Sequence, residues 1–278
     1  MILVRPLVTL DECQKVADLE KTVWEFTDAE DVVPSSLLIV SIKRGGLLLG
    51  AFDDAGTLQG FVYSMPAVKD GRLTQWSHML AVAPEARGTG LGLRLKLAQR
   101  DHALRAGVDL IEWTFDPLQA LNAHLNLSRL GVIVDEYDED VYGESTSPLH
   151  LGTPTDRFVA EWRLTAPHVE RRISLPIASL IRDSSVMSAV AVNGTRDTGD
   201  WREPSPPRLD ASDRRLLVEI PTDFTEMQRR HPDLAMEWRL VTRSIFGTYL
   251  RRGYRVVDFF LAREARRGQY LLAQRAES

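Results

Sequence analysis

Eleven residues in the first half of the chain, Val82 to Gly92, constrain the fold more than any other segment. They read VAPEARGTGLG and place three glycines at alternate positions. Glycines let the backbone fold tightly and bring several N–H groups to one point. A β-like run from Trp76 to Val82 precedes the segment, and an amphipathic run from Leu93 to Leu104 follows it. The pattern therefore predicts a strand, a tight loop and a helix N-terminus, which together form a cradle for phosphate.

Two other interpretations of the glycines stay open. A glycine-rich turn can simply connect a strand to a helix. The spacing also approaches a dinucleotide-binding loop, because Glu112 follows the glycines by about 20 residues. Against that loop, Leu93 occupies its third glycine position and Pro84 separates the strand from the glycines. About 80 residues precede the segment, whereas the dinucleotide signature usually begins its domain.

The composition indicates a globular protein of one large or two modest domains. The chain has 278 residues, 44% hydrophobic and 26% charged, and a net charge of −5, which gives no sign of nucleic-acid binding. No apolar run approaches 18 residues, so we expect no membrane span. Cys13 is the single cysteine, which fits a reducing cytoplasm and a buried, inert thiol. The N-terminus lacks the pattern of a signal peptide, and we expect a cytoplasmic protein.

Hydrophobic periodicity and turn residues divide the first part of the chain into alternating strands and helices. A capping-box pattern, Thr9 to Glu12, begins the first helix. After the helix that follows the glycine loop, a second helix of this region is predicted from about Leu118 to Leu130, and it stops at Gly131. The predicted strands are residues 2–5, 47–52, 59–65, 76–82, 108–115, 132–134 and 158–164.

The pattern changes after residue 165, and we expect a boundary between a domain of residues 1–165 and an α/β extension of residues 166–278. Residues 193–215 contain glycines and a proline cluster and predict an exposed loop. A strand at 216–220, a helix whose apolar face runs from Leu234 to Tyr249, and a strand at 254–261 follow. Both Gly131 and Gly253 come between a helix end and a strand, so the extension is either a partial repeat of the first domain or a common α/β connection.

The order of strand, Pro-Glu-x-Arg, Gly-x-Gly and helix resembles the pyrophosphate-binding signature of the GNAT acyltransferase superfamily. The resemblance implies an α/β (α+β) fold with a mixed, mostly antiparallel twisted sheet flanked by helices. It also implies coenzyme A as acetyl-CoA or succinyl-CoA, and no metal. The coenzyme-binding residues that it implies are Leu80, Ala81, Val82, Arg87, Gly88, Thr89, Gly90, Leu91, Gly92, Asn122 and Asn126.

Acyl transfer to an amine needs a group that accepts a proton from the amine. His78 is the candidate base, because it shares a strand face with Leu80 and Val82 and an imidazole titrates near neutral pH. A histidine satisfied within a half-buried sheet is the competing interpretation. Asp116, at a strand end before Pro117, is a second catalytic candidate, although an aspartate before proline is also ordinary turn chemistry.

The proton donor of this superfamily is usually a tyrosine four residues before the glycine that closes the second helix. Counting back from Gly131 gives Leu127 here, which departs from the family pattern. His124, one turn earlier, is the catalytic candidate that replaces it, and Tyr137 and Tyr142 are alternatives.

Several further stretches resemble a two-part GNAT family with members similar to amino-acid N-succinyltransferases. These stretches are SHM at 77–79, WTFDPL at 113–118, NAH at 122–124, NL at 126–127, YG at 142–143, TDRF at 155–158, EIP at 219–221 and RRGY at 251–254. The resemblance implies an N-acyltransferase that acts on a small-molecule amine such as an amino acid. Arg157 then binds a substrate carboxylate, unless it forms a surface ion pair with Asp156.

Two other functions stay open. They are N-acetylation of a protein or peptide and a non-catalytic sensor of acyl-CoA. We expect no nucleic-acid or membrane partner, and a homodimer is left open.

Overall fold

The computed structural model describes residues 2–26, 31–143, 152–174 and 188–275. The chain forms two compact units, one of residues 1–113 and one built from residues 114–145 and 150–278. These units divide the chain earlier than the expected boundary at 165/166. β5 (Leu110–Phe115) contributes residues to both units.

The first unit contains a strand, two helices, three more strands and a third helix before it reaches β5. Its elements are β1 (Leu3–Pro6), α1 (Leu10–Trp24), α2 (Ser35–Lys43), β2 (Leu47–Phe52), β3 (Leu58–Lys69), β4 (Arg72–Val82), a 3-10 turn (Pro84–Ala86) and α3 (Leu91–Arg105). The strands lie in the order β1-β2-β3-β4-β5. β1 to β4 are antiparallel neighbours, and β4 and β5 are parallel.

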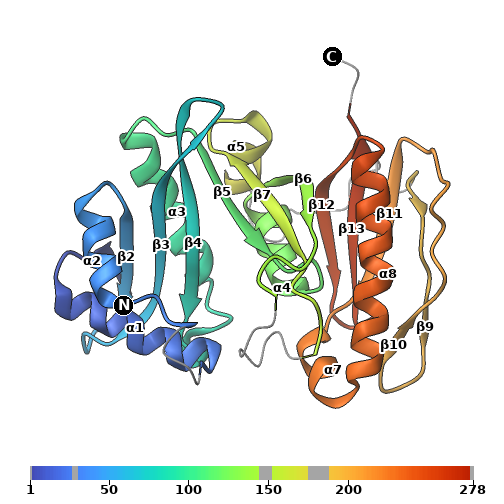
Figure 1. Cartoon of the computed structure of the whole chain (residues 1–278), viewed down its shortest axis with the longest axis horizontal. Helices are drawn as coiled ribbons and strands as arrows, with labels where there is room; N and C mark the ends of the chain where they lie inside the picture. Colours follow the sequence, from blue (N-terminus) through green and yellow to red (C-terminus); the bar gives the residue numbers. More distant parts are fainter. Residues whose placement is uncertain (1, 27–30, 144–151, 175–187, 276–278) are drawn as a thin grey trace. The chain divides into compact units, whose positions relative to one another are not determined.

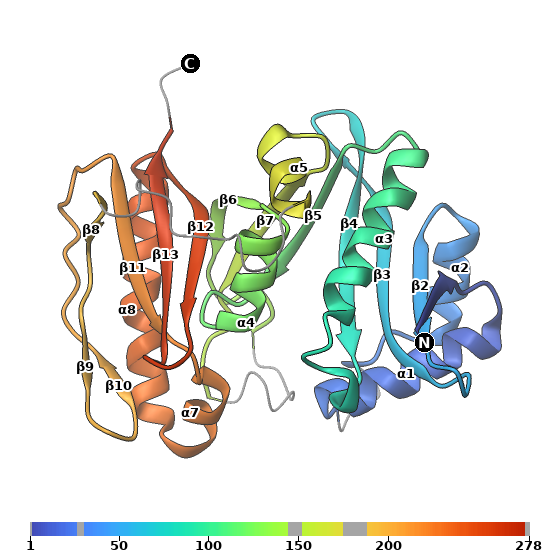
Figure 2. The ribbon, with the colours of Figure 1, turned by 180° about the vertical axis from the view of Figure 1, so that it is seen from behind.

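Helices cover both faces of this sheet. α1 and α2 lie against one face and α3 against the other, as opposite views show (Figures 1 and 2). Alternate strand residues accordingly enter two cores, because successive side chains of a strand point to opposite faces. Leu48 and Phe61 pack with Val16 and Leu38 under α1 and α2. Leu49 and Val62, their sequence neighbours, pack with Leu91 and Leu95 of α3.

The capping box predicted at the start of α1 is confirmed. The Thr9 side chain accepts a hydrogen bond from the Glu12 amide, and the Glu12 carboxylate accepts one from the Thr9 amide. Two amides that the helix itself cannot pair are thereby satisfied. Cys13 is fully buried one turn later, and burial raises the pKa of its thiol, so the expected inert thiol is confirmed.

The second unit is also a sheet with helices. Its elements are α4 (Ala120–Ala123), a π-helical turn (His124–Arg129), β6 (Ile133–Asp138), β7 (Arg157–Arg163), α5 (Pro167–Ser174), β8 (Val190–Ala191), β9 (Thr195–Asp197), β10 (Arg202–Pro204), β11 (Arg215–Pro221), α7 (Phe224–Arg230), α8 (Pro232–Arg251), β12 (Tyr254–Ala262) and β13 (Arg267–Gln274). Six strands follow the order β7-β6-β12-β13-β11-β8, and β9 and β10 form a separate hairpin. α8 covers one face of β11, β12 and β13 (Figures 1 and 2).

The expected fold class, a mixed and mostly antiparallel sheet flanked by helices, is confirmed. Several details differ from the sequence prediction, among them α5, β8 and α7, which were not expected. The helix expected at 118–130 is a short α-helix followed by a π-helical turn. The loop expected at 193–215 contains the hairpin β9–β10, and β13 was not predicted at all. No helix in the described residues is long and apolar enough to cross a membrane.

Candidate functional site

The glycine segment forms a tight, exposed loop between β4 and α3. Gly88 and Gly90 have φ angles of +78° and +83°, which residues with a Cβ atom rarely adopt. Apart from each glycine's own chain neighbours, no atom of the described residues lies within 4 Å of the position that a Cβ would take there. The loop is held from within, because the Thr89 hydroxyl donates to the Ala86 carbonyl at 2.7 Å. The glycines therefore serve the backbone path of an open loop and do not make room for a neighbouring side chain.

The N-terminus of α3 has no side-chain cap. Gly90 is the N-cap residue and has no side chain that could accept a hydrogen bond. The amides of Leu91, Gly92 and Leu93 have no acceptor within the helix, because an α-helix leaves its first N–H groups unpaired. These amides and the positive end of the helix dipole favour an anionic ligand at this point.

His78 occupies a β-bulge in β4. The pairing of β3 with β4 steps from Tyr63 with Met79 to Ser64 with Ser77, so His78 is an extra residue. The His78 side chain is solvent-exposed, and its ring lies edge-on to Tyr63 at a centroid distance of 6.0 Å. Partial burial of the ring lowers the pKa of the imidazole. His78 is therefore neutral and accessible near pH 7, as a base must be, and the interpretation as a histidine satisfied inside the sheet is disfavoured.

Beyond Trp76, no residue of β4 pairs with β5 in the part of the chain that the structure describes. The two strands pair in parallel only through Gln75 with Ile111 and Trp76 with Glu112. The Ala83 amide donates to Gln59 of β3 at 2.9 Å. Because amides alternate between the two edges of a strand, those of Val82 and Leu80 point to the edge away from β3.

A buried lysine lies beside the last paired residues of β4 and β5. Lys96 of α3 is 2% exposed, its Nζ donates to Ser77 Oγ at 2.8 Å, and it lies 3.7 Å from the centroid of the Trp113 ring. Burial lowers the pKa of Lys96 to about 7. Gln99 is fully buried beside Ser77, and its Nε2 has no hydrogen-bond partner in the described part of the chain. This cluster was not predicted, although Lys96 and Gln99 share the inward face of α3 with Leu95 and Ala103.

Asp116, in the second unit, is held in a buried ion pair. Both carboxylate oxygens accept from the Arg239 guanidinium at 2.8 Å, and one also accepts from the Leu118 amide. Burial alone would raise the pKa of this carboxyl, but the Arg239 charge outweighs it and keeps the pKa below its usual value. A carboxylate fixed in this way is a poor proton acceptor. The structure therefore corrects the expectation that Asp116 is catalytic and favours the alternative of a turn residue. Its partner, Arg239, lies 123 residues away in the sequence.

Arg157 is buried rather than on the surface, with 7% of its area exposed. Its sequence neighbour Asp156 is bound by a different cation, Arg243, whose Nε and Nη2 donate to the two carboxylate oxygens at 2.9 and 2.5 Å. The alternative of a surface ion pair between Arg157 and Asp156 is therefore wrong. Arg157 lies over the ring of Tyr142 at 5.2 Å, and its role in binding a carboxylate stays a prediction.

The other expected residues of the second unit lie on α4 and the π-helical turn. Asn122 is exposed and Asn126 is buried. Leu127 is also fully buried. His124 is half-buried, and its Nδ1 has no hydrogen-bond partner among the described residues. Burial lowers the pKa of His124, and the charges of Arg129 and Arg263 lower it further. A neutral imidazole is a weak acid, so His124 can donate a proton only after it has first gained one.

From β1 to β4 the chain forms a strand, two helices and three antiparallel strands. The glycine loop and its helix follow, and then come a strand parallel to β4, a helical segment and two further strands. This is the order that the GNAT resemblance implied. The first part of the chain has a GNAT-type fold.

Comparisons with known proteins show what the chain is similar to. No protein-family model and no curated protein matches the chain. Solved structures similar to it include the ribosomal-protein-S18-alanine N-acetyltransferase of Escherichia coli (16% identity, 60% of this chain, 96% of that chain, TM-score 0.48). A GNAT-family acetyltransferase of Streptococcus pneumoniae (15%, 58%, 98%, 0.46) and the PaiA N-acetyltransferase of Thermoplasma acidophilum with coenzyme A (18%, 59%, 99%, 0.43) are also similar.

Proposed function

We propose that the chain is an acyl-CoA-dependent N-acyltransferase that transfers an acyl group from coenzyme A to the amine of a small molecule. The glycine loop carries the proposal. Its open backbone and the uncapped N-terminus of α3 offer N–H donors, and a diphosphate is the anion that suits several amides at once. Arg87 is exposed in the same loop and adds a positive charge.

The free edge of β4 supports the second part of the proposal. The amides of Leu80 and Val82 point away from β3, where an extended pantetheine arm would find donors, as a strand does at the edge of a sheet. An N–H that binds the thioester oxygen gains strength as that oxygen gains charge, and one such donor is worth about 3 kcal/mol. His78, exposed on the bulge between them and Ser77, would accept the proton of the attacking amine.

His124 stays the proposed proton donor for the leaving thiolate, and Arg157 the proposed ligand of a carboxylate. Asn122 and Asn126 stay proposed ligands of the coenzyme. The acyl group is acetyl or succinyl, and an amino acid is the proposed acceptor, because an N-succinyltransferase-like reaction would place one carboxylate on each substrate. The proposal includes a cytoplasmic location, which the single buried cysteine supports.

We further propose that the C-terminal part is a degenerate second GNAT half. β5 to β7 and β11 to β13 share the order strand, helical segment, strand, strand, where the helical segment is α4 with the π-helical turn in the first series and α7 with α8 in the second. The residues that follow the two helical segments include Gly131 and Gly253, at φ +70° and +84°. β11 pairs in parallel with β8, as β5 does with β4. The second half has no glycine loop like that of Gly88 to Gly92, so only the first half would bind coenzyme A.

Thiol release tests the proposal. Purified protein is incubated with acetyl-CoA or succinyl-CoA and a panel of amino acids, peptides and other amines, and free coenzyme A is measured. Release that depends on a small amine supports the proposed enzyme, and the faster thioester identifies the donor. Release only with peptides would favour the protein N-acetyltransferase, whereas tight coenzyme A binding without any release would favour the sensor. No binding of coenzyme A would contradict all three.

A further inference from the structure

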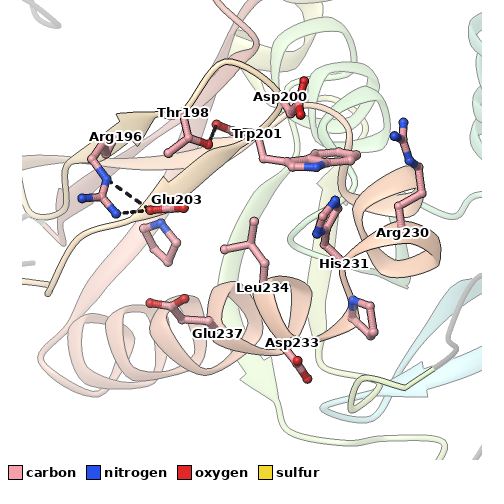
Figure 3. Close-up of a pocket in the computed structure, with 12 residues that line it drawn as sticks. Arg196, Thr198, Asp200, Trp201, Glu203, Arg230, His231, Asp233, Leu234 and Glu237 are labelled. Atoms are coloured by element: carbon pink, nitrogen blue, oxygen red, sulfur yellow. Dashed lines mark hydrogen bonds and ion pairs between the residues drawn. The ribbon is translucent and has the colours of Figure 1, made fainter.

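A pocket lies wholly within the C-terminal unit, between the hairpin β9–β10 and the start of α8. Its volume is about 770 Å³. Residues of the hairpin form one wall, and residues 230–234 and Glu237 form the other, as Figure 3 shows. None of these residues belongs to the glycine loop or to the proposed catalytic groups.

The wall formed by the hairpin is tied to the rest of the unit. Trp238 of α8 donates its indole N–H to the Arg202 carbonyl at 2.8 Å. Arg266 donates to the carbonyls of Asp200 and Gly199 at 2.6 and 2.7 Å, which fixes the turn of the hairpin. The pocket is therefore formed before any ligand arrives, and preformed walls reduce the entropy cost of binding.

One end of the pocket is lined by a buried indole whose N–H lacks an acceptor among the described residues. Trp201 is 7% exposed, and its Nε1 has no hydrogen-bond partner in the described residues. Figure 3 shows the ring above Leu234 and beside His231, whose ring it meets edge-on at 5.3 Å. A buried indole N–H without an acceptor is costly, so an acceptor supplied by a ligand would stabilise it.

The N-terminus of α8 adds donors at the same end. His231 is the N-cap residue, and its side chain makes no capping hydrogen bond. Pro232 follows and has no N–H, which leaves the amides of Asp233 and Leu234 without an acceptor in the helix. The dipole of this 20-residue helix favours a negative group here, and Arg230 lies beside it (Figure 3).

The opposite side of the pocket presents carboxylates. Glu203 and Glu237 lie there together with Arg196, as Figure 3 shows. Arg196 is already paired with Glu203, whereas Glu237 is exposed and makes no hydrogen bond among the described residues. Asp200 and Asp233 also line the pocket, beside Trp201 and in the first turn of α8 (Figure 3), so four carboxylates and two guanidinium groups line it in all. Arg230, the second guanidinium, has its own carboxylate in Glu226 at 3.8 Å. The excess of negative charge favours a ligand with an ammonium group.

We propose that this pocket is a second ligand site, which binds a small zwitterion of the amino-acid class. The ligand carboxylate accepts from the Trp201 indole and the first amides of α8. The ligand ammonium donates to Glu237 and Glu203. Neither a simple carboxylate nor a simple amine satisfies both sides, because each leaves one set of groups without a partner. The site is distinct from the proposed acyltransferase reaction and holds whether or not the chain transfers an acyl group.

Isothermal titration calorimetry tests the site with the full-length protein and no coenzyme A. Each of the common amino acids is titrated singly. For any that binds, the N-acetyl derivative, which lacks the ammonium, and the methyl ester, which lacks the carboxylate, are titrated next. We expect the free amino acid to bind about tenfold or more tightly than either derivative, as loss of a charged hydrogen bond predicts. Equal affinity of a derivative, or no binding of any amino acid, overturns the proposal.

Two variants locate the binding. Glu237→Gln removes a carboxylate of the pocket, and Glu264→Gln makes the same change at an exposed position outside it. We expect about tenfold weaker amino-acid binding in Glu237→Gln and unchanged binding in Glu264→Gln. Trp201→Phe removes the indole N–H, and we expect weaker binding with circular dichroism like that of the parent protein. If Trp201→Phe does not fold, Glu237→Gln decides alone. If Glu237→Gln binds the amino acid as tightly as the parent protein does, the ligand binds elsewhere and the assignment is overturned.

Discussion

The Lys96 ammonium nitrogen lies 2.8 Å from Ser77 Oγ, with the ring of Trp113 on another side of it at 3.7 Å. This contact joins α3, whose N-terminus carries the glycine loop, to the residue of β4 that precedes the bulged His78. The lysine has no carboxylate partner among the described ion pairs. A fully buried ammonium without a counter-ion is costly, and loss of its proton reduces that cost.

Lys96 makes the stability of the protein depend on pH. Its pKa is about 7 in the folded chain against an ordinary value of 10.5, so the unfolded chain binds more protons between these values. The free energy of unfolding therefore rises with pH from about 7 to about 10, by about 4 kcal/mol at most. We expect Lys96→Met to remove most of this rise in urea unfolding at pH 7, 8 and 9. Lys15→Met, at an exposed position of α1, should keep it, and a parallel slope in both variants would contradict the assignment.

A carboxylate on the glycine loop should repel a diphosphate. We expect Gly90→Glu to weaken coenzyme A binding by at least about tenfold, because it places a negative charge beside the amides of α3. Gly56→Glu is the matched control: Gly56 also has a positive φ, of +78°, and open space around its Cβ position. Both variants should lose about 1 kcal/mol of stability through backbone strain. Calorimetry with coenzyme A separates them, and equal affinities would place the coenzyme elsewhere.

Much of the fold was predictable because its signals are local. The capping box at Thr9 and the glycines at 88 and 90 act over a few residues, and both are confirmed as structure. β13 was missed because the turn before it, residues 263–266, contains no glycine or proline. Arg266 adopts a positive φ of +48° there without being glycine. A turn formed without glycine or proline is hard to predict from a sequence.

The site was less predictable where distant residues decide it. Nothing near Asp116 in the sequence reveals Arg239, so its carboxylate looked free to act as a base. Lys96 was not singled out in the sequence, although its spacing from Gln99 and Ala103 fits the buried face of α3. Tertiary packing overrides the usual preference of lysine for solvent.

His78 should contribute to turnover rather than to coenzyme binding. We expect His78→Asn to lower kcat with the preferred amine by about 100-fold or more, the range of general base catalysis. The affinity for coenzyme A should stay within a factor of about two. The acid limb of the parent pH profile should report a pKa below 6.5, the direction of the shift at His78, and it should disappear in the variant. His102→Asn, on α3, is the control, and an unchanged kcat in His78→Asn would leave the bulge a structural role only.

Asp116 should matter for stability rather than for chemistry. Asp116→Asn leaves the buried Arg239 guanidinium without its counter-charge, which costs about 3–5 kcal/mol. Asp109→Asn breaks the exposed pair with Arg72 and should cost less than about 1 kcal/mol. Urea unfolding measures both, and thiol release per folded molecule should match the parent in each. A folded Asp116→Asn variant with parental stability and lost turnover would restore the catalytic role.

Glu20 should produce the opposite pH dependence from Lys96. It is fully buried in α1, one carboxylate oxygen accepts from the Val33 amide at 2.9 Å, and the other has no partner in the described residues. Burial raises its pKa from 4.5 to about 7, so the folded chain binds the extra proton between these values. The free energy of unfolding should therefore fall as pH rises from about 5 to about 7.

Glu20→Gln carries no charge at any pH and should lose this fall, whereas Glu264→Gln should keep it. The windows of Glu20 and Lys96 adjoin near pH 7, so their joint contribution to stability is smallest there. A pH dependence that is the same in the parent and in Glu20→Gln would contradict the assignment to Glu20.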